Sequence, residues 1–407
     1  MTVPAEVLEL RSPRAIRERC RRIFEAGLRD ELVHFQVDLS RLDAAAAITA
    51  EVTRERYPSL VVPAHSRLSH FNSPGMNRER QIDTALQSAT THERACALFD
   101  LVVVSVLLDA GAGADYRYRA PDTGEELRRS EALAVASLHW LASGALSSRR
   151  APYAVDAPGL SGVDAEALAK AFQVGPDNPL VGVSGRVHLL KQLATALRER
   201  PTLFGPEARP CGLLDFFSRC APDGPLPAER VLSALLDGLG DIWPSRLSLA
   251  GVALGDCFRH PEAGGSGRSE GLVPFHKLSQ WLTYSLIAPT EAAGFSVVEL
   301  DGLTGLAEYR NGGLFMDTGV LTLKDPAAAA AAHPVDSELV VEWRALTVAL
   351  LDELAPRVRS QLGKSARELP LPSVLEGGSW AAGRKLAAQR RKDGGPPLRV
   401  VSDGTVF

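Results

Sequence analysis

Apolar residues recur at helical spacing along most of the chain. The first case is Ile16, Cys20 and Ile23, which follow Ser12, a residue suited to capping, and Pro13, which suits a first helical position. Similar patterns predict further helices from Asp43 to Pro58 and over 79–110, 128–145, 163–173, 183–200, 212–220, 227–240, after Pro274 and over 335–362. The pattern therefore predicts a mainly α, multi-helical globular fold.

Extended segments are few and short in this pattern. Residues 31–39 alternate imperfectly, and 295–300 and 398–407 are further short extended pieces. Strands and helices do not alternate as a parallel sheet requires, which excludes an α/β fold. A flexible loop is expected at 262–271, where the sequence reads EAGGSGRSEG. The chain is expected to form one unit over 1–407 or two lobes, an N-terminal helical lobe (1–260) and a C-terminal lobe (272–407).

The charge balance limits the partners. Lys and Arg total 45 against 49 Asp and Glu, a net charge of −4. Such a chain has no general basic field for nucleic acid or an anionic membrane, so local basic groups must meet any anion that it binds. We therefore expect a small-molecule partner and neither nucleic acid nor membrane.

The cysteines and the N-terminus favour a cytoplasmic protein. The five cysteines are odd in number and never spaced as C-x-x-C, which fits a reducing compartment. The first residues lack the basic, apolar and small-residue segments of a signal peptide. The most apolar stretch, 95–114, contains Asp100 and Asp109, so a buried helix is expected there and not a membrane span.

Several common catalytic motifs are absent from the sequence. It contains no G-x-x-x-x-G-K-[ST], no G-x-G-x-x-G after a strand and no G-x-S-x-G. His92 and Glu93 begin like a zinc-protease helix, but Cys96 stands where the second histidine is needed. His65 and His70 could bind a metal together with His92, but no carboxylate or cysteine pair stands at ligand spacing, so ordinary hydrogen-bonded histidines are favoured. No metal and no other cofactor is therefore expected.

The helix after Pro274 carries the first candidate binding residues. Its apolar stripe contains Phe275, Leu278, Leu282 and Leu286, which places four polar residues on the opposite face: His276, Lys277, Gln280 and Tyr284. A solvated surface is the simpler interpretation of this face. Lysine, glutamine and tyrosine together also suit a phosphorylated or hydroxylated ligand, so both interpretations stay open.

A glycine-punctuated segment, 299–313, carries the candidate acid–base groups. It contains Glu299, Asp301, Glu308 and Arg310. Cleavage of a glycosidic bond needs a carboxylate that offsets developing positive charge and a group that orients water or protonates the leaving group. The alternative interpretation, equally weighted, is that Asp301 caps a short helix and Glu308 pairs with Arg310 or a neighbour.

Four sequence runs carry a resemblance to the fungal and bacterial proteins associated with uracil catabolism: PFHKLSQWLTYSL, VELDGLTGLAEYRNGGLFMDTGVL, VDSELVVEWRALTVALLDEL and VVSDGTVF. The resemblance spans nearly the whole chain. It implies a role in the route that opens the pyrimidine ring while the ring is attached to ribose. The middle runs are more distantly similar to queuosine-salvage nucleotide glycosylases, which implies a helical fold related to that of DNA glycosylases.

The glycosylase resemblance can be followed residue by residue. Phe275, Lys277 and Gln280 match a phenylalanine-aromatic-Lys-x-x-Gln run, and His276 occupies its aromatic position. Glu308, Tyr309 and Arg310 match an acidic-Tyr-Arg tripeptide, with Glu in place of the usual Asp and without the Pro-Gln that usually follows. Glu342 and Arg344 match a Glu-x-Arg-Ala helix, although the position of Glu342 beside the apolar stripe is typical of a structural glutamate.

These observations lead to one functional hypothesis and one alternative. The hypothesis is hydrolysis of the N-glycosidic bond of a ribosylated, 5′-phosphorylated uracil-breakdown product such as ribosylurea phosphate. Asp301 and Glu308 are the candidate catalytic residues. The candidate substrate-binding residues are Phe275, His276, Lys277, Gln280, Tyr309, Arg310, Glu342 and Arg344. The alternative is a non-catalytic protein that binds or channels such an intermediate; a nucleic-acid glycosylase is disfavoured by the net charge.

Overall fold

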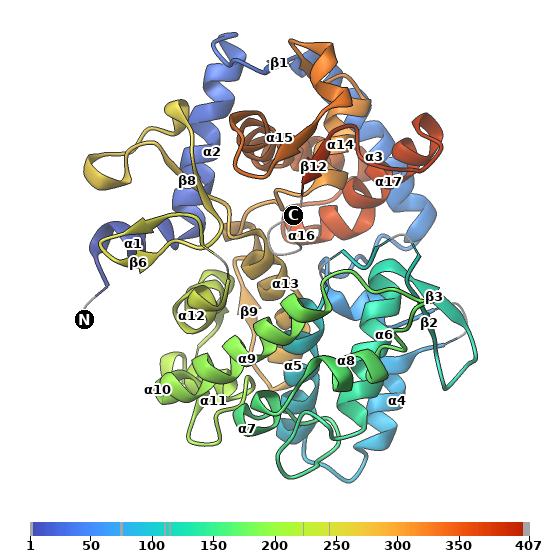
Figure 1. Cartoon of the computed structure of the whole chain (residues 1–407). Helices are drawn as coiled ribbons and strands as arrows, with labels where there is room; N and C mark the ends of the chain where they lie inside the picture. Colours follow the sequence, from blue (N-terminus) through green and yellow to red (C-terminus); the bar gives the residue numbers. More distant parts are fainter. Residues whose placement is uncertain are drawn as a thin grey trace. The chain divides into compact units, whose positions relative to one another are not determined.

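The computed structural model describes residues 3–73, 76–109, 111–113, 115–222, 224–243 and 245–401. Helices dominate these residues and the strands are at most three residues long, which confirms the mainly α fold (Figure 1). The chain divides into two compact units, each built from separate segments. The first contains Met1–His65, Pro244–Gln280 and Glu299–Phe407, and the second contains Ser66–Trp243 and Trp281–Val298.

This division joins the N-terminal and C-terminal segments in one unit. The sequence-based lobes 1–260 and 272–407 placed those segments apart, so the contact-based units group the chain differently. The boundary falls inside helix α13 (Lys277–Ala292), between Gln280 and Trp281.

The longest helix of the first unit, α15 (Glu338–Leu362), packs against several of the unit's other helices. The helices of this unit are α1 (Ala5–Leu10), α2 (Pro13–Leu28), α3 (Leu42–Arg56), α14 (Tyr309–Asp317), α15 itself, α16 (Leu371–Val374) and α17 (Trp380–Arg390). Helix α15 packs against both α2 and α3 (Figure 1). It continues through Pro356 and ends at Leu362, and the residue that follows, Gly363, has a positive φ of 64° that suits glycine.

The predicted N-terminal helix shows how the local sequence determines an element. The Ser12 hydroxyl accepts the N–H of Ala15 at 3.1 Å, and Pro13 occupies the first helical position. Ile16, Cys20 and Ile23 are buried on one face, as their spacing predicts.

The strands of the first unit form two-stranded pairs. They are β1 (Phe35–Val37) with β10 (Leu321–Leu323), β5 (Ser248–Leu249) with β6 (Val252–Ala253), β7 (Cys257–Arg259) with β8 (Leu272–Pro274), and β11 (Ala332–Pro334) with β12 (Arg399–Val401). The first three pairs are antiparallel and the last is parallel. In β7–β8, Cys257 lies opposite Pro274. Part of the last predicted strand, residues 402–407, lies outside the described residues.

The second unit is also helical. Its helices are α4 (Arg78–Ala85), α5 (Thr91–Leu107), α6 (Arg129–Ala142), α7 (Ala157–Ser161), α8 (Ala165–Ala171), α9 (Val183–Glu199), α10 (Pro201–Phe204), α11 (Gly212–Cys220) and α12 (Ala228–Leu239). Strands β2 (Arg117–Arg119) and β3 (Glu126–Arg128) form a hairpin, and β4 (Leu226–Pro227) pairs in parallel with β9 (Val297–Val298). The single helix predicted over 79–110 is two helices, because Thr90 and Glu93 form a capping box that starts α5.

The start of α13 also differs from the prediction. Pro274 ends strand β8, and the helix begins three residues later at Lys277. His276, the residue before the helix, has a positive φ of 46°. A left-handed residue there turns the chain from the strand into the helix.

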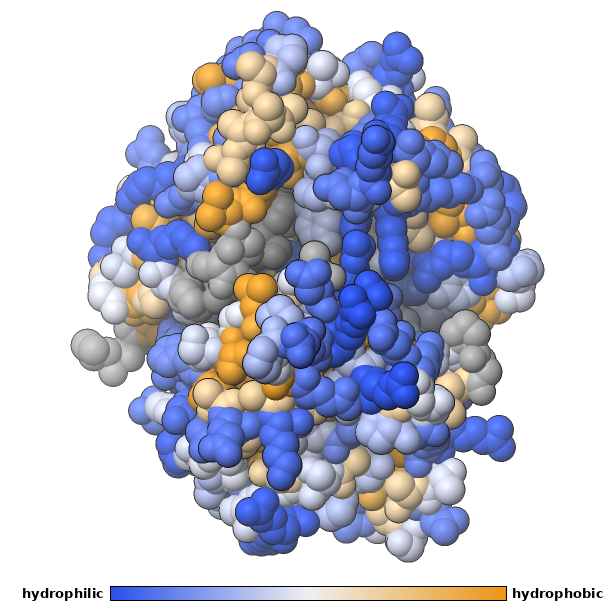
Figure 2. All heavy atoms as spheres, turned by 45° about the vertical axis from the view of Figure 1, so that its right-hand side comes forward, coloured by the Kyte–Doolittle hydropathy of each residue, from blue (hydrophilic) through white to orange (hydrophobic). Residues whose placement is uncertain are grey.

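The face of the molecule drawn in Figure 2 is mostly polar. Figure 2 shows a face on which hydrophilic side chains predominate and apolar ones lie in small groups. The exposed large apolar side chains are dispersed along the sequence: Leu8, Leu28, Val33, Val61, Val181 and Val401. Among the described residues, no helix is both long and apolar enough to cross a bilayer.

Candidate functional site

Glu308 is a buried carboxylate at the start of helix α14. Its side chain accepts the N–H of Arg310 at 2.8 Å and that of Asn311 at 2.6 Å, so it caps the helix. The residue is 7% exposed. Burial raises its pKa, against the opposing effects of the two N–H groups, the Lys277 ammonium and the His65 imidazole. The positive charges of Lys277 and His65 thus favour the ionised form of Glu308.

The position of Lys277 depends on Asp256. Lys277 is the first residue of α13, and its backbone N–H donates to Oδ2 of Asp256 at 2.9 Å. The carbonyl of Asp256 accepts the N–H groups of Phe275 at 2.9 Å and His276 at 3.3 Å. Asp256 therefore binds the turn that leads into the helix through both its backbone and its side chain.

Arg344 holds Asp256 in turn. Its two terminal nitrogens each lie 2.8 Å from one carboxylate oxygen of Asp256. Burial opposes ionisation of Asp256, but the charge and hydrogen bonds of Arg344 outweigh it and lower the pKa of that carboxyl. Arg344 Nε also approaches the carbonyl of Ala307, the residue before Glu308, at 3.4 Å. One guanidinium thus links the segments that carry Lys277 and Glu308.

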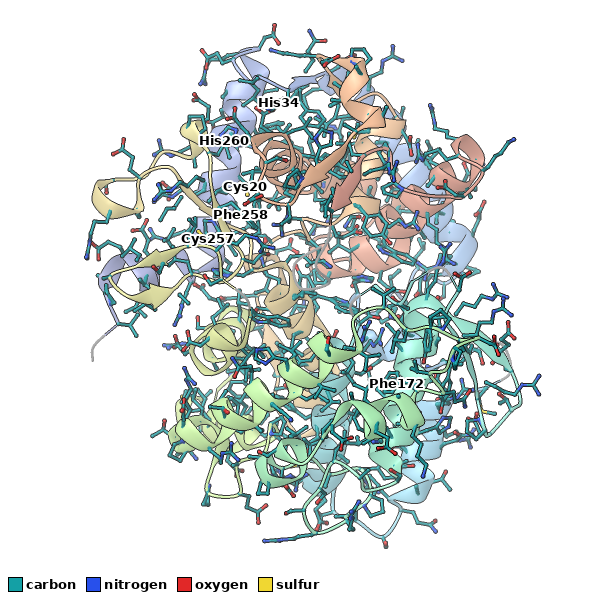
Figure 3. The ribbon with its side chains drawn as sticks, in the orientation of Figure 1. Cys20, His34, Phe172, Cys257, Phe258 and His260 are labelled. Carbon is teal, nitrogen blue, oxygen red and sulfur yellow. The ribbon has the colours of Figure 1, made fainter. Side chains whose placement is uncertain are left out.

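Two aromatic rings flank this guanidinium. Its central carbon lies 4.2 Å from the ring centre of Phe275 and 5.4 Å from that of Phe258 on β7. Figure 3 labels Phe258 beside Cys257 in the first unit. Cation–π contacts of this kind favour the charged guanidinium in a buried position. Phe275 is therefore placed to hold Arg344.

His65 and Glu376 form a second buried pair. Nδ1 of His65 lies 2.8 Å from Oε2 of Glu376, while the other oxygen accepts from Arg56 at 2.9 Å and from Tyr57 at 2.8 Å. Burial alone would raise the pKa of Glu376, but the hydrogen bond and charge of His65, with Arg56, lower it to about 2. Glu376 is held ionised, and it orients the His65 ring.

Glu376 lies in an unusual turn. Residues Leu375–Ser379 form a π-helical turn, η8, between α16 and α17. Such turns occur frequently at functional sites. Gly378 is needed there, because a Cβ at this position would lie 2.2 Å from the carbonyl oxygen of Thr49 on α3. The His65 ring also lies 6.2 Å from Trp380, at the start of α17.

Tyr309 and Arg310 follow Glu308 in α14. The Arg310 guanidinium lies 4.8 Å from the Tyr309 ring centre, and Nη1 donates to the carbonyl of Gly394 at 2.8 Å. Arg310 therefore connects α14 to the segment after α17. The predicted pairing of Glu308 with Arg310 exists only through the backbone N–H of Arg310.

Asp301 occupies a different environment. Oδ2 lies 2.7 Å from Nη2 of Arg359, and Oδ1 accepts the N–H of Leu371, the first residue of α16, at 2.6 Å. Its side chain is 41% exposed. These contacts connect Asp301 to α15 and α16, and Asp301 itself lies inside the short helical turn Leu300–Gly302.

The polar face predicted for α13 is not solvated. Gln280 and Tyr284 are buried, and so is His276 just before the helix, so the surface interpretation is wrong. The Gln280 amide bonds the hydroxyl of Thr304 and accepts its N–H at 3.3 Å. His276 lies away from that face, with Nε2 3.0 Å from the carbonyl of Leu10, and burial lowers its pKa.

Glu342 contacts another part of the first unit. Its carboxylate accepts the N–H groups of Val33 at 3.2 Å and His34 at 3.1 Å, in the segment before β1. Two residues further along α15, Arg344 contacts Asp256. The Glu-x-Arg motif therefore serves two separate networks.

The three histidines considered for a metal have separate contacts. His65 bonds Glu376, Nδ1 of His70 lies 3.2 Å from Nη1 of Arg67, and Nε2 of His92 lies 3.4 Å from the Cys96 sulfur.

Sequence reasoning missed Asp256 and Glu376. Asp256 is 88 positions from Arg344, and Glu376 is 311 from His65, so no local spacing connects either pair. The Gly377–Gly378 pair inside a helical stretch was the one usable signal, because adjacent glycines in a helix indicate close packing.

The fold and these contacts define a mainly helical protein with a buried carboxylate site. The chain belongs to the family described as "Protein of unknown function (DUF1688)", whose model matches residues 9–407. It is 36% identical over 442 residues to "Uracil catabolism protein 4" of Lachancea kluyveri, covering 100% of both chains. It is also 37% identical over 414 residues to "Protein urg3" of Schizosaccharomyces pombe, covering 98% of this chain and 99% of the relative. The resemblance to uracil-catabolism proteins is thereby confirmed, while the more distant similarity to nucleotide glycosylases stays a prediction.

Proposed function

We propose that the protein acts in uracil catabolism and hydrolyses the N-glycosidic bond of a ribosylated breakdown product such as ribosylurea 5′-phosphate. The observation that carries this proposal is the environment of Glu308, a buried carboxylate on which the positive charges of Lys277 and His65 act. The name of the Lachancea relative supports the pathway. A buried carboxylate next to basic groups suits a reaction that develops positive charge on a sugar.

Each group has a role in this proposal. Glu308 stabilises the oxocarbenium-like transition state and takes a proton from the attacking water. Water oxygen bonds to the anomeric carbon as the carbon–nitrogen bond breaks, and the leaving nitrogen takes a proton from His65, which Glu376 orients. Lys277 binds the phosphate, since an ammonium is a suitable point charge for it.

The remaining matched residues have positioning roles. Arg344 and Phe275 hold Asp256 and thereby the start of α13, and Gln280 bonds Thr304 in the segment before Glu308. Asp301 has a structural role in this proposal: it stabilises the fold through its contacts with Arg359 and with the first residue of α16. Of the two candidate carboxylates, we assign catalysis to Glu308.

One observation favours the alternative, a non-catalytic binding or channelling protein. Both oxygens of Glu308 already accept backbone N–H groups, which a purely structural helix cap would also do. In that case Lys277 and His65 would bind the ligand without turnover.

Turnover separates the two functions. The purified protein is incubated with ribosylurea and its 5′-phosphate, and released urea and free sugar phosphate are measured with and without a chelator. At an assay temperature below the melting temperature of the protein, we expect release from the phosphorylated compound both with and without the chelator. Saturable binding without release would support the channelling role. Release that stops with chelator while the protein stays folded would exclude the carboxylate mechanism.

A further inference from the structure

Glu342 is a fully buried carboxylate without a cationic partner in the described part of the chain. It is 0% exposed, and its contacts are the N–H groups of Val33 and His34 and the imidazole of His260, with Nε2 at 3.6 Å from Oε1. No lysine or arginine of the described ranges pairs with it. Burial of a carboxylate is costly unless a cation or a set of strong hydrogen bonds compensates.

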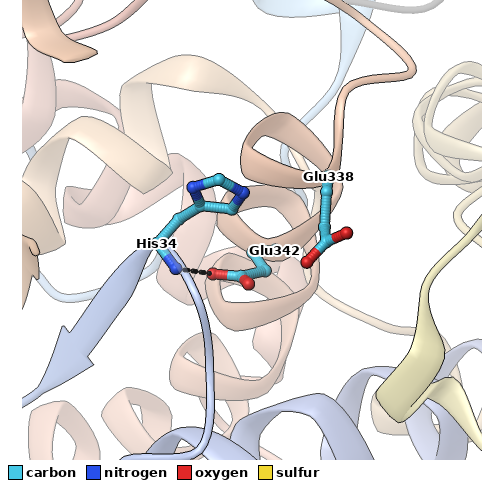
Figure 4. Close-up of side chains that lie close together, drawn as sticks. All are labelled: His34, Glu338 and Glu342. Carbon is cyan, nitrogen blue, oxygen red and sulfur yellow. Dashed lines mark hydrogen bonds between the residues drawn. The ribbon is translucent and has the colours of Figure 1, made fainter. Parts of the chain in front are cut away.

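Two further ligand-type side chains meet at this carboxylate. His34, Glu338 and Glu342 each offer a nitrogen or oxygen atom, and these atoms all lie within 4.8 Å of one another. Figure 4 shows the two glutamates on successive turns of α15 and the His34 imidazole beside them. The four-residue spacing places both glutamates on one face, and His34 comes from the segment just before β1.

His260 supplies a second, independent observation. It is 2% exposed, and Nδ1 accepts the N–H of Glu262 at 3.1 Å. The proton of the neutral ring therefore lies on Nε2, which has no hydrogen-bond partner and points toward Glu342. Figure 3 labels His34 and His260, both in the first unit. A buried, unpartnered donor directed at a carboxylate is typical of the outer shell of a metal ligand.

We propose that His34, Glu338 and Glu342 bind a divalent first-row transition-metal cation. One imidazole nitrogen and two carboxylate oxygens suit Zn²⁺, Co²⁺, Mn²⁺ or Fe²⁺, because this set mixes the ligand preferences of those ions. Three protein ligands leave the other coordination positions to water. The two negative charges of the glutamates balance the divalent cation, which compensates the buried charge of Glu342.

The N–H groups on Glu342 are compatible with this role. Each carboxylate oxygen accepts one backbone hydrogen bond, and an oxygen with two lone pairs keeps one for a metal. Hydrogen bonds to a ligating carboxylate orient it, as outer-shell groups do in metal sites.

The metal would join two distant parts of the sequence. His34 precedes β1, and Glu342 lies on α15, 308 positions later in the sequence. The role assigned to it is structural, to fix the start of α15 against the segment before β1. The inference is independent of the proposed hydrolysis, because it uses neither Glu308, Lys277 nor His65, and either can fail alone.

The test uses the full chain after removal of metal. Zn²⁺ and Co²⁺ are titrated into it, and stoichiometry, melting temperature and the visible Co²⁺ spectrum are measured. We expect one equivalent to bind, a higher melting temperature with metal, and Co²⁺ ligand-field bands that report a nitrogen and oxygen ligand set.

Two variants and a matched control locate the site. Glu338→Gln keeps the shape of an exposed side chain, and His34→Gln removes the imidazole from a half-buried one, so both variants should fold. Loss of an outer-shell group weakens metal binding by up to about 100-fold. Loss of a ligand in either variant should therefore weaken binding at least that much. Asp336→Asn removes an exposed charge two residues before Glu338 and should bind like wild type. Unchanged affinity and Co²⁺ spectra in both ligand variants, or no one-to-one binding by the wild type, would overturn the proposal.

Discussion

Arg344 binds both carboxylate oxygens of Asp256 at 2.8 Å, and the same carboxylate accepts the N–H of Lys277 at 2.9 Å. The start of α13 therefore depends on an ion pair between residues 88 positions apart. Because Arg344 is 1% exposed and Asp256 is 7% exposed, neither charge can be compensated by water if the other is removed.

Asp256→Asn should accordingly destabilise the protein. Removing one partner of a buried pair typically costs about 3–5 kcal/mol, because the other charge stays buried and uncompensated. Asp352→Asn is the control: it breaks the partly exposed pair with Arg17 and should cost about 1 kcal/mol or less. Urea unfolding measures the free energy of unfolding of both variants. Equal losses would show that the Arg344–Asp256 pair stabilises the fold no more than a partly exposed ion pair does.

The sequence predicted local features of this site better than long-range ones. The cap at Ser12 and the buried stripe of α2 follow from residues within one helix. Helical periodicity and the acidic segment 299–313 indicated Lys277 and Glu308, and the resemblance matched both, but the partners that position the site were not found. Asp256 and Glu376 are recognisable only when segments 88 and 311 positions apart come together. The polar face of α13 was misjudged because helical periodicity does not show which helices are buried on all sides.

Glu376 should make stability depend on acid pH. Its folded-state pKa of about 2 lies below the ordinary value of 4.5, so its interactions stabilise the folded protein fully above pH 4.5. That contribution, up to about 3 kcal/mol, is lost as the pH falls from 4.5 through about 2. Glu376→Gln should flatten this part of the stability profile, as measured by melting at a series of pH values. A variant profile parallel to that of wild type would contradict the pKa assignment.

Lys277→Met should discriminate against a phosphorylated substrate. Methionine keeps the length of the side chain and removes its charge. Loss of a hydrogen bond to a charged group costs about 1.5–3 kcal/mol, equivalent to a rise of about 10- to 100-fold in KM. The KM for the dephosphorylated compound should change little, and Lys364→Met, which removes a cation paired with Glu368, serves as the control. Equal effects on both substrates would remove the phosphate role.

Glu308 should determine the acidic limb of the activity profile. Burial raises its pKa above the ordinary 4.5, and the proposed mechanism needs the ionised carboxylate. We therefore expect kcat/KM to fall as the pH decreases, with a midpoint above 4.5. Initial rates over a pH series test this point, and full activity down to pH 4.5 would argue against Glu308 as the base.

The central claim, that Glu308 is the catalytic carboxylate, is tested most directly by comparing kcat for urea release in Glu308→Gln and Asp301→Asn. Both changes keep the shape of the side chain and remove its charge. We predict a loss of about 100-fold or more in kcat for Glu308→Gln. Its melting temperature should fall moderately, since glutamine keeps one oxygen for the cap but turns its amide NH2 toward the other backbone N–H. We predict near wild-type kcat and a lower melting temperature for Asp301→Asn, because Arg359 loses its partner. Wild-type turnover by a folded Glu308→Gln variant would contradict the account.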